Sequence, residues 1–495
     1  MLVTTRALTR DDARAGRIAL RGGADALTYG DLWHHADAVR LASAAWPGGG
    51  GGTPFAALVS DDSPHAVATF LGLNAAGWAV GVLDRAWSPD EVRGALAQLA
   101  PAAFVSPVGP PPGDGAAWSD AGHLGAGWRA WTRGGTPGTA PAPSPDDTFY
   151  VGFTSGTSGR PKAFARSHRS WWESFARFTE AAPPPAGTVI VPGPLSSSHF
   201  LFGALHGLHE GATVHLGALA SAMAPGADEP PGAAYVVPTM LAALCERTAS
   251  PGERVPAVFY CAGARLEAAV RGRVRERFPA ATVVEYYGAS ELSFVTLRRD
   301  GDATPAGSVG SPFPGVELSV RDGAGNPVPP GTTGTIHVRS PLVFQGYRGV
   351  PPEGAAAPAV DGWLTVGDRG RVDEAGHVWV DGRGSALIIT GGTNVQPEEV
   401  EEVVAAAPGV AACVVVGIPD PARGEVVCAC VVPAPGALPD RKALRAHVAA
   451  RLAPAKRPRR WVHWTRPVPL TRSGKVDRAA VAAALAGADA PPDVR

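Results

Sequence analysis

Hydroxyl, glycine and basic residues are concentrated in the segment TSGTSGRPK, at residues 154–162, directly after the apolar run FYVGF and before an expected helix. Its glycines allow tight turns, and its four hydroxyls and backbone N–H groups can surround phosphate oxygens. The GxxxxGK[ST] pattern of a Walker A loop is absent, and a plain surface loop is the alternative. The segment predicts phosphate binding by Thr154, Ser155, Gly156, Thr157, Ser158, Gly159 and the positively charged Lys162.

A second polar group, YYGASE at residues 286–291, follows the apolar run TVVE. Ligands of open α/β sheets bind where the strands end, and this segment brings an aromatic ring, a glycine turn, a hydroxyl and a carboxylate to such a point. A tyrosine can stack on a nucleobase, and Glu291 can hold Mg²⁺ through its oxygens. A turn with a solvated glutamate is the alternative.

Two further motifs carry charged side chains beside glycine turns. In GWLTVGD, at residues 362–368, Asp368 can accept hydrogen bonds from two ribose hydroxyls, and Arg383 can donate to them. In PLTRSGKVDR, at residues 469–478, Lys475 follows a glycine and precedes an expected helix. Each motif alone is typical of a structural turn or a surface lysine, and their order along the chain is what makes them informative.

The elements that position these motifs can be predicted from hydrophobic patterning. Up to about residue 288, short apolar runs alternate with helical segments, as in parallel βαβ units, apart from an irregular Gly- and Pro-rich insertion expected at about 106–147. After about residue 305, short alternating runs predict an antiparallel subregion. From residue 384 onward, strands and helices predict a small unit that is long enough for its own core.

We therefore predict an α/β fold with two domains. Residues 1–383 form a large N-terminal domain of βαβ-type sheets plus a β-rich subdomain, and residues 384–495 form a smaller, mobile α+β C-terminal domain. The N-terminal domain is expected to bind ATP and the acid substrate that are inferred below.

Composition excludes several other classes of protein. The 495 residues carry a net charge of -1, which gives no electrostatic reason to expect nucleic acid or an anionic membrane as partner. No apolar run approaches the length of about 18 residues that a transmembrane helix needs, and the N-terminus lacks the apolar region of a signal peptide. The five cysteines lack a CxxC spacing and are expected to be reduced and buried. A cytoplasmic location is expected.

Taken together, the four motifs resemble those of the adenylate-forming superfamily, which includes acyl-CoA synthetases, stand-alone adenylation domains of peptide synthetases, and luciferases. The resemblance extends from about LTYGDL to VDRAAV, and GRGSALIITGGTNVQPEEVEE is similar to the family's hinge and C-domain entry. It implies that a carboxylic acid attacks the α-phosphate of ATP, giving an acyl-adenylate. A thiol of CoA or of a phosphopantetheinyl carrier then takes the acyl group.

The resemblance also implies residue roles. Residues 154–162 hold the β- and γ-phosphates, Ser290 lies near the α-phosphate, and Lys475 bridges that phosphate and the reacting carboxylate while Glu291 helps to bind Mg²⁺. Adenine contacts are assigned to Tyr287, Gly263 and Ala264, ribose contacts to Asp368 and Arg383, the thiol tunnel to Gly391 and Gly392, and the hinge to Ala386. The C-terminal domain rotates between the two steps.

Three positions depart from the family pattern. Ala386 stands where the hinge usually carries Asp or Lys, and alanine still permits the backbone change, although the balance between the two arrangements is open. Ala163 replaces a glycine after the loop lysine and is expected to stiffen the end of the loop. Arg265 replaces a proline, so that it either faces a phosphate or an acidic acyl group or is simply solvated.

The acid is predicted from the residues expected around it, which are mostly apolar or aromatic: His199, Phe200, Gly203, Val237, Cys261 and Gly288. No aspartate among them pairs with an α-amino group, which argues against an amino-acid substrate. An aromatic or medium-length aliphatic acid is favoured. His199 could gate the pocket, orient the carboxylate or simply pack.

An acid–CoA ligase is the leading prediction. Loading of a carrier protein is a close alternative, for which AKRPRR at residues 455–460 could supply a basic docking patch. A third option is an adenylate-forming enzyme of specialised metabolism that uses another oxyanion or nucleophile. A degenerate scaffold protein is disfavoured by the presence of Glu291, Asp368 and Lys475.

Overall fold

The computed structural model describes residues 2–48, 52–113, 118–134, 142–154, 162–224, 229–248, 252–349, 360–383, 388–390, 393–395, 397–420, 424–452, 454–487 and 491–494. The chain divides into two compact units. The first comprises residues 1–304, 309–318 and 338–364, and the second comprises residues 305–308, 319–337 and 365–495. The predicted boundary after residue 383 falls inside the second unit. That residues 384–495 form the part that rotates stays a prediction.

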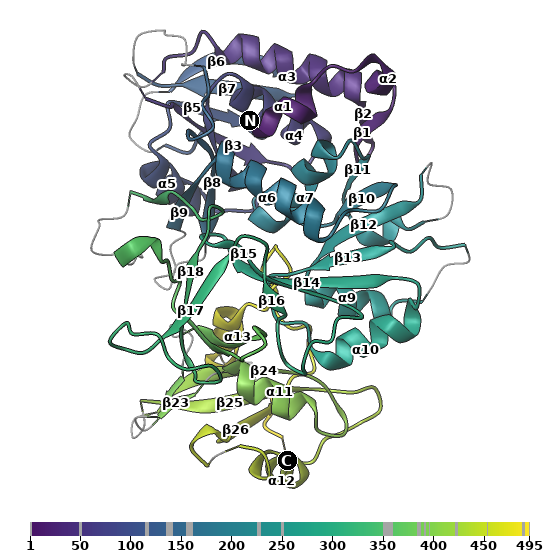
Figure 1. Cartoon of the computed structure of the whole chain (residues 1–495), viewed down its shortest axis with the longest axis vertical. Helices are drawn as coiled ribbons and strands as arrows, with labels where there is room; N and C mark the ends of the chain where they lie inside the picture. Colours follow the sequence, from purple (N-terminus) through teal and green to yellow (C-terminus); the bar gives the residue numbers. More distant parts are fainter. Residues whose placement is uncertain are drawn as a thin grey trace. The chain divides into compact units, whose positions relative to one another are not determined.

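The first unit contains an eight-stranded sheet in the order β19-β9-β8-β4-β3-β5-β7-β6 (Figure 1). Its strands are β3 (Phe55–Ser60), β4 (Ala79–Asp84), β5 (Ala103–Ser106), β6 (Ser119–Gly125), β7 (Trp128–Thr132), β8 (Thr148–Thr154), β9 (Lys162–Ser167) and β19 (Gly346–Arg348). The four central strands pair in parallel, as the alternation of strands and helices predicts.

The hairpin β6–β7 lies in the segment that was expected to be an irregular insertion. The expectation was wrong for these residues, because Trp128, Ala130 and Trp131 are buried, and Ala130 and Trp131 pair with residues of β5. Their apolar contribution is hidden in the sequence by the surrounding glycines and prolines.

A nine-stranded sheet in the order β16-β15-β14-β13-β12-β10-β11-β1-β2 completes the first unit. Its strands are β1 (Ile18–Gly22), β2 (Asp25–Thr28), β10 (Thr188–Val191), β11 (Val214–Leu216), β12 (Pro231–Val236), β13 (Val258–Cys261), β14 (Thr282–Ala289), β15 (Ser293–Arg299) and β16 (Ser311–Pro312). The six neighbouring strands β1, β11, β10, β12, β13 and β14 pair in parallel. At the two edges of the sheet, β2, β15 and β16 are added in antiparallel orientation.

Helices between the two sheets bury apolar side chains, and two of the helices are buried along almost their whole length. They are α1 (Val3–Leu8), α3 (Tyr29–Ser43), α4 (Pro64–Ala75), α6 (His168–Ala181) and α7 (Ser198–His209). Helix α4 begins at the N-cap Ser63, contacts strands of both sheets, and is buried from Ala66 to Asn74. Gly72 lets α4 approach the backbone of α3, where a side chain would meet the Ala36 carbonyl oxygen.

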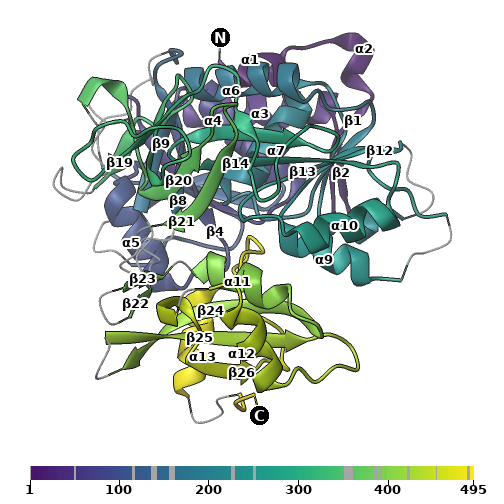
Figure 2. The ribbon, with the colours of Figure 1, turned by 60° about the horizontal axis from the view of Figure 1, so that its bottom comes forward.

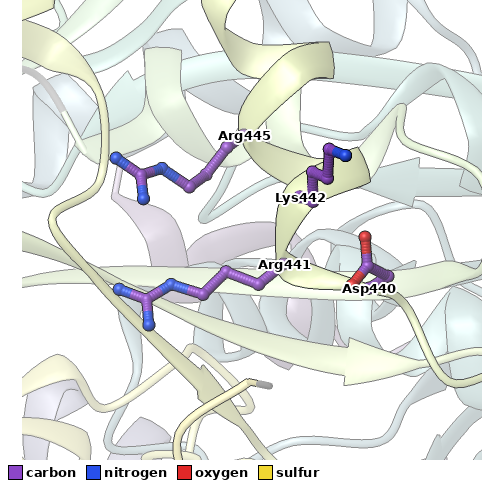
Figure 3. A pocket seen from close by; sticks show the side chains of 4 residues that line it. All are labelled: Asp440, Arg441, Lys442 and Arg445. Carbon is purple, nitrogen blue, oxygen red and sulfur yellow. The ribbon is translucent and has the colours of Figure 1, made fainter.

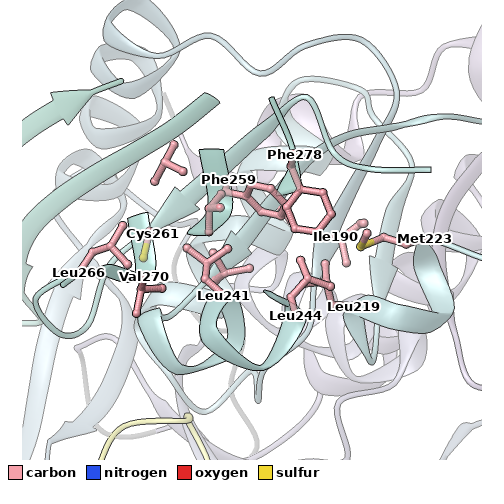
Figure 4. Packing of buried hydrophobic residues seen from close by; sticks show 14 of the residues in the cluster. Ile190, Leu219, Met223, Leu241, Leu244, Phe259, Cys261, Leu266, Val270 and Phe278 are labelled. Carbon is pink, nitrogen blue, oxygen red and sulfur yellow. The ribbon is translucent and has the colours of Figure 1, made fainter. Parts of the chain in front are cut away.

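Other helices cover the outer faces of the sheets. Helix α5 (Pro89–Leu99) buries Val92, Leu96 and Leu99 on the eight-stranded sheet. Helices α9 (Pro238–Glu246) and α10 (Ala268–Arg277) cover the nine-stranded sheet, where Figure 4 shows Leu241 and Val270 packed with residues of the strands. The short helices α2 (Asp12–Ala15) and α8 (Leu219–Ala222) complete the set in this unit.

The second unit contains a five-stranded sheet with helices on both faces (Figure 2). Its strands are β22 (Ile388–Thr390), β23 (Thr393–Val395), β24 (Val410–Asp420), β25 (Gly424–Pro433) and β26 (Arg460–His463), and its helices are α11 (Pro397–Ala405), α12 (Arg441–Ala449) and α13 (Arg478–Ala486). One set of alternate residues of β24 and β25 packs against α11 and α12, and the other set packs against α13. The predicted small α+β unit is confirmed.

A four-stranded sheet has the order β17-β18-β20-β21 and corresponds to the predicted β-rich subdomain. Its strands are β17 (Glu317–Arg321), β18 (Gly334–Arg339), β20 (Asp368–Val372) and β21 (Val378–Arg383). The five cysteines are free, and all but Cys245 are buried. Within the described residues, none of the helices combines the length and the apolar character that crossing a membrane would require.

Candidate active site

The carboxyl ends of parallel strands bring several predicted residues to one edge of the nine-stranded sheet. Val237 follows β12, Gly263 and Ala264 follow β13, and Tyr287 lies near the end of β14. Val237 is buried, Gly263 and Ala264 are exposed, and Tyr287 is half-buried. Such an edge is where ligands of open α/β sheets bind.

A tight turn between β14 and β15 presents Ser290 and Glu291. Gly288 is paired with Phe294 across this turn, and any side chain at residue 288 would collide with the Ser293 carbonyl oxygen. Ser293 has a φ of 61°, and its hydroxyl is 3.2 Å from that of Ser174 on α6. The turn is therefore fixed by a required glycine and by a contact with the neighbouring helix.

Glu291 is a buried carboxylate with a defined partner. Its side chain is only 4% exposed, and the Tyr347 hydroxyl donates to its Oε1 at 2.7 Å. The Glu291 carbonyl oxygen accepts from the Phe344 N–H at 2.8 Å. Tyr347 belongs to β19, an edge strand of the eight-stranded sheet, so a residue of one sheet orients the carboxylate presented by the other.

Lys162 lies beside the same tyrosine, because its Nζ is 5.7 Å from the centre of the Tyr347 ring. Thr154 and Lys162 are register partners at the ends of β8 and β9, so the phosphate-loop segment connects two antiparallel strands. The helix expected after the segment is α6, and the strand β9 lies between the segment and that helix. Tyr347 thus links Lys162 to Glu291, although no sequence signal singled it out.

A second polar group lies at the start of α7. The Ser198 and Ser290 hydroxyls are 3.1 Å apart, and His199 Nδ1 is 2.6 Å from the Tyr286 hydroxyl. His199 Nε2 is 3.1 Å from the Val236 carbonyl oxygen. Because a carbonyl only accepts, Nε2 carries the proton, and in the neutral ring Nδ1 accepts from Tyr286. Burial raises the pKa of Tyr286 well above its ordinary value, which keeps this donor protonated.

The other predicted acyl-pocket residues have different surroundings. Phe200 is fully buried, and Gly203 lies against Tyr235, whose ring would be 2.6 Å from a methyl group at residue 203. Cys261 is packed in the hydrophobic cluster under α9 and α10 (Figure 4), and Gly288 is exposed. Within the predicted set, the His199 and Phe200 rings lie 4.8 Å apart, whereas Cys261 belongs to the cluster under α9 and α10.

In the second unit, Asp368 and Arg383 are register partners on β20 and β21. Asp368 is 4% exposed, and it follows a turn in which Gly367 has a φ of 81° and donates to Thr365 Oγ1 at 3.0 Å. The register places the two residues opposite each other, the Arg383 side chain lies outside the described part of the structure, and their shared contact with a ribose stays a prediction.

Lys475 is exposed on a hairpin of the second unit. The Thr471 N–H donates to the Lys475 carbonyl oxygen at 2.7 Å, and the Lys475 N–H donates to Thr471 Oγ1 at 3.1 Å. Gly474 has a φ of 81°, as the hairpin turn requires.

Several predicted residues lie outside the described residues. They are Ser155, Gly156, Thr157, Ser158 and Gly159 of the phosphate loop, Ala386 of the hinge, and Gly391 and Gly392 of the thiol tunnel. The structure therefore tests none of their predicted roles.

Metal binding by a cluster of protein side chains has no support among the described residues, which contain no group of three or more His, Cys, Asp or Glu suited to an ion. His206 is buried between the Thr179 and Tyr235 hydroxyls, at 2.9 Å from each, and burial lowers its pKa to about 3. Mg²⁺ commonly takes one or two carboxylates and completes its shell with substrate phosphates and water. The single carboxylate of Glu291 is sufficient for that kind of site.

Comparison with known proteins adds a family relationship. The family model described as AMP-binding enzyme matches residues 9–348, and the model described as AMP-binding enzyme C-terminal domain matches residues 399–475. An uncharacterized acyl-CoA ligase of Bacillus subtilis, YhfT, is 38% identical over 350 residues, 69% of each protein. A feruloyl-CoA synthase of an Amycolatopsis species is 36% identical over 343 residues, 67% of this chain and 68% of that one.

The fold agrees with that of solved structures over nearly the whole chain. The crystal structure of ATP-bound MatB from Rhodopseudomonas palustris superposes with a TM-score of 0.81 at 26% identity. The match covers 99% of this chain and 100% of that one.

Proposed function

Because this chain belongs to the AMP-binding enzyme family, we propose that it converts a carboxylic acid and ATP to an acyl-adenylate and pyrophosphate, and then transfers the acyl group to the thiol of CoA. It is an enzyme of the AMP-forming acid–thiol ligase type. The resemblance of its four motifs and the similarity of its relatives agree on this class of reaction.

The observation that carries the proposal is the group formed by Glu291, Tyr347 and Lys162. An acid that attacks ATP must approach a polyanion, so that positive charge has to be supplied around the phosphates. Lys162 supplies one such charge at the end of the phosphate loop. Glu291 is the residue that would hold Mg²⁺, which neutralises phosphate charge when bound, and Tyr347 keeps the carboxylate in one orientation.

The remaining roles are those that the resemblance of the motifs implies. Tyr287 stacks on adenine beside Gly263 and Ala264, and Ser290 donates its hydroxyl towards the α-phosphate. Asp368 and Arg383 hold the ribose. Lys475 donates to the attacking carboxylate and the α-phosphate oxygens, which lowers the repulsion between them. Gly391 and Gly392 line the path of the thiol after the C-terminal domain, residues 384–495, has rotated about Ala386.

For the acid, we propose an aromatic or medium-length aliphatic carboxylate. Support comes from the rings and aliphatic groups around α7, and from His199, whose two ring nitrogens are both engaged by protein groups. An imidazole held at both nitrogens is better suited to shape an aromatic pocket than to pair with a second charge on the substrate. The feruloyl-CoA synthase is a relative named for an aromatic acid.

Pyrophosphate release over a panel of aromatic, medium-chain and amino acids, with and without CoA, tests the proposal. We expect release with an aromatic or medium-chain acid, and thioester formation when CoA is added. Release with amino acids alone would contradict the proposed acid. The absence of release with every acid would contradict the proposed function, and release without a thioester would favour another nucleophile.

A carrier protein is the second candidate acceptor, and a basic surface on α12 favours it. In the segment predicted for docking, Lys456 pairs with Glu399 at 2.7 Å and Arg460 with Asp493 at 3.1 Å, so these charges are engaged inside the unit. Helix α12 instead presents basic side chains around a hollow of about 530 Å³ (Figure 3). Its lining residues are Asp440, Arg441, Lys442 and Arg445.

The two acceptors can be separated by charge reversal on α12. Lys442→Glu combined with Arg445→Glu should slow transfer to an acidic carrier protein and leave transfer to CoA unchanged, because complementary charges mainly speed association. Equal rates with the carrier for wild type and variant would exclude this docking surface.

A further inference from the structure

We infer that Arg478 is a positioning residue for the adenylation step, because its ion pairs with α11 hold the hairpin that carries Lys475. The inference rests on the proposed function. Arg478 and its two partners on α11 all belong to the second unit.

The hairpin of Lys475 is short, and its bonds join its two arms to each other and to the start of α13. Leu470 and Val476 form an isolated antiparallel bridge, and the Asp477 N–H donates to the Pro469 carbonyl oxygen at 2.9 Å. Asp477 then caps α13 by accepting from the Ala480 N–H at 2.9 Å. The base of the hairpin is thus continuous with the first turn of α13, and anything that fixes this turn also fixes Lys475.

Arg478 is the first residue of α13 and fixes that turn to another helix. Its Nη2 is 2.7 Å from Glu401 Oε2 and 3.1 Å from Glu398 Oε1, both on α11. Glu401 is itself fixed to the sheet, because its Oε1 accepts from the Val415 N–H of β24 at 2.7 Å. The contact therefore runs from the hairpin through Arg478 and Glu401 to the central strands.

Stability alone does not account for this arrangement. The side chain of Glu401 is only 15% exposed, and burial raises its pKa to about 7 despite the nearby Arg478. A carboxylate that is costly to ionise is a poor choice for stabilising a fold, and buried pairs can be replaced by apolar residues with little loss. The ion pair instead fixes the distance between the base of the hairpin and α11.

The position of α11 makes the contact relevant to both half-reactions. Helix α11 begins two residues after β23, whose hairpin with β22 carries the segment assigned to the thiol path. The Lys475 hairpin, which follows α11 in the sequence, is attached to the same helix through Arg478. Loss of Arg478 should loosen the base of the hairpin, although Val476 still packs against the hydrophobic cluster under α13. It should leave α11 in contact with the sheet through Glu401 and Val415.

The test compares Arg478→Met with Arg460→Met in the full chain, using an acid that the wild type activates. Arg460 has a similarly exposed side chain, 32% against 34%, and also pairs with a carboxylate, but its partner is Asp493. We expect Arg478→Met to lower the single-turnover rate of acyl-adenylate formation by about tenfold or more, because small misplacement of a catalytic group is costly. The KM for ATP and thioester formation from a synthetic acyl-adenylate should change little.

Two further variants separate positioning from folding. Arg478→Lys keeps the charge and should recover part of the adenylation rate, and Glu401→Gln should lower that rate without lowering the melting temperature at pH 8. Equal adenylation rates in Arg478→Met and Arg460→Met would overturn the inference, as would equal loss of both half-reactions in folded Arg478→Met. If the wild type releases no pyrophosphate with any acid, the proposed function fails instead.

Discussion

At the scale of single residues, Glu291 shows how burial and one hydrogen bond prepare a carboxylate for a charged ligand. Its side chain is almost fully buried, and Tyr347 donates to one of its two oxygens. A hydrogen bond to a charged group contributes about 1.5–3 kcal/mol, enough to select one rotamer of the carboxylate. The second oxygen then keeps a fixed direction.

Replacement of Tyr347 by phenylalanine tests this role. Tyr347→Phe should raise the Mg²⁺ concentration needed for half-maximal pyrophosphate release by about tenfold or more, because loss of a partner that orients a ligand has an effect of this size. Tyr29→Phe is the matched control, since it removes a hydroxyl that donates to the Ala212 carbonyl oxygen at 2.9 Å in the same unit. An unchanged Mg²⁺ requirement in Tyr347→Phe would rule out the orienting role.

At the scale of elements, the site depends on turns that follow strands. The phosphate-loop segment connects β8 and β9, and the turn between β14 and β15 presents Ser290 and Glu291. Both are connections between antiparallel strands, in which the sheet register fixes where each end lies. The helix α6, which the sequence predicts after the phosphate loop, is separated from the loop by β9.

The turn at Gly288 can be tested by a single methyl group. Gly288→Ala places a Cβ against the Ser293 carbonyl oxygen, and we expect a loss of about 1–3 kcal/mol of stability with a large fall in adenylation, as overpacking of a fixed backbone predicts. The control Gly272→Ala lies on α10 where a Cβ meets nothing within 4 Å, and it should fold and react normally. If Gly288→Ala keeps the denaturant midpoint and the adenylation rate of the wild type, the turn tolerates a side chain and this interpretation is wrong.

Elements and motifs differ in how far the sequence predicts them. Parallel strands such as β3 and β4 are continuous apolar runs between helices, so their pairing follows from patterning alone. Tyr347 could not be found this way, because it is brought to Glu291 by the addition of β19 to the edge of β9, a pairing of residues far apart in sequence. The Arg478–Glu401 contact was missed for the same reason, since nothing local identifies a partner 77 positions away.

At the scale of the whole molecule, the proposed reaction draws on both compact units. Lys162 and Glu291 belong to the first, and Asp368 and Lys475 belong to the second. The proposed assignment therefore lets one set of residues serve adenylation and another serve thiol transfer. A residue needed for only one step should therefore affect only one half-reaction.

Lys475→Ala measures this most directly. In single-turnover assays with an accepted acid, the variant should form acyl-adenylate at least about a hundredfold more slowly than wild type, since a charged group that acts in the transition state is lost. Thioester formation from a supplied acyl-adenylate and CoA should stay near the wild-type rate. Equal loss of both half-reactions, or wild-type adenylation by the variant, would contradict the account.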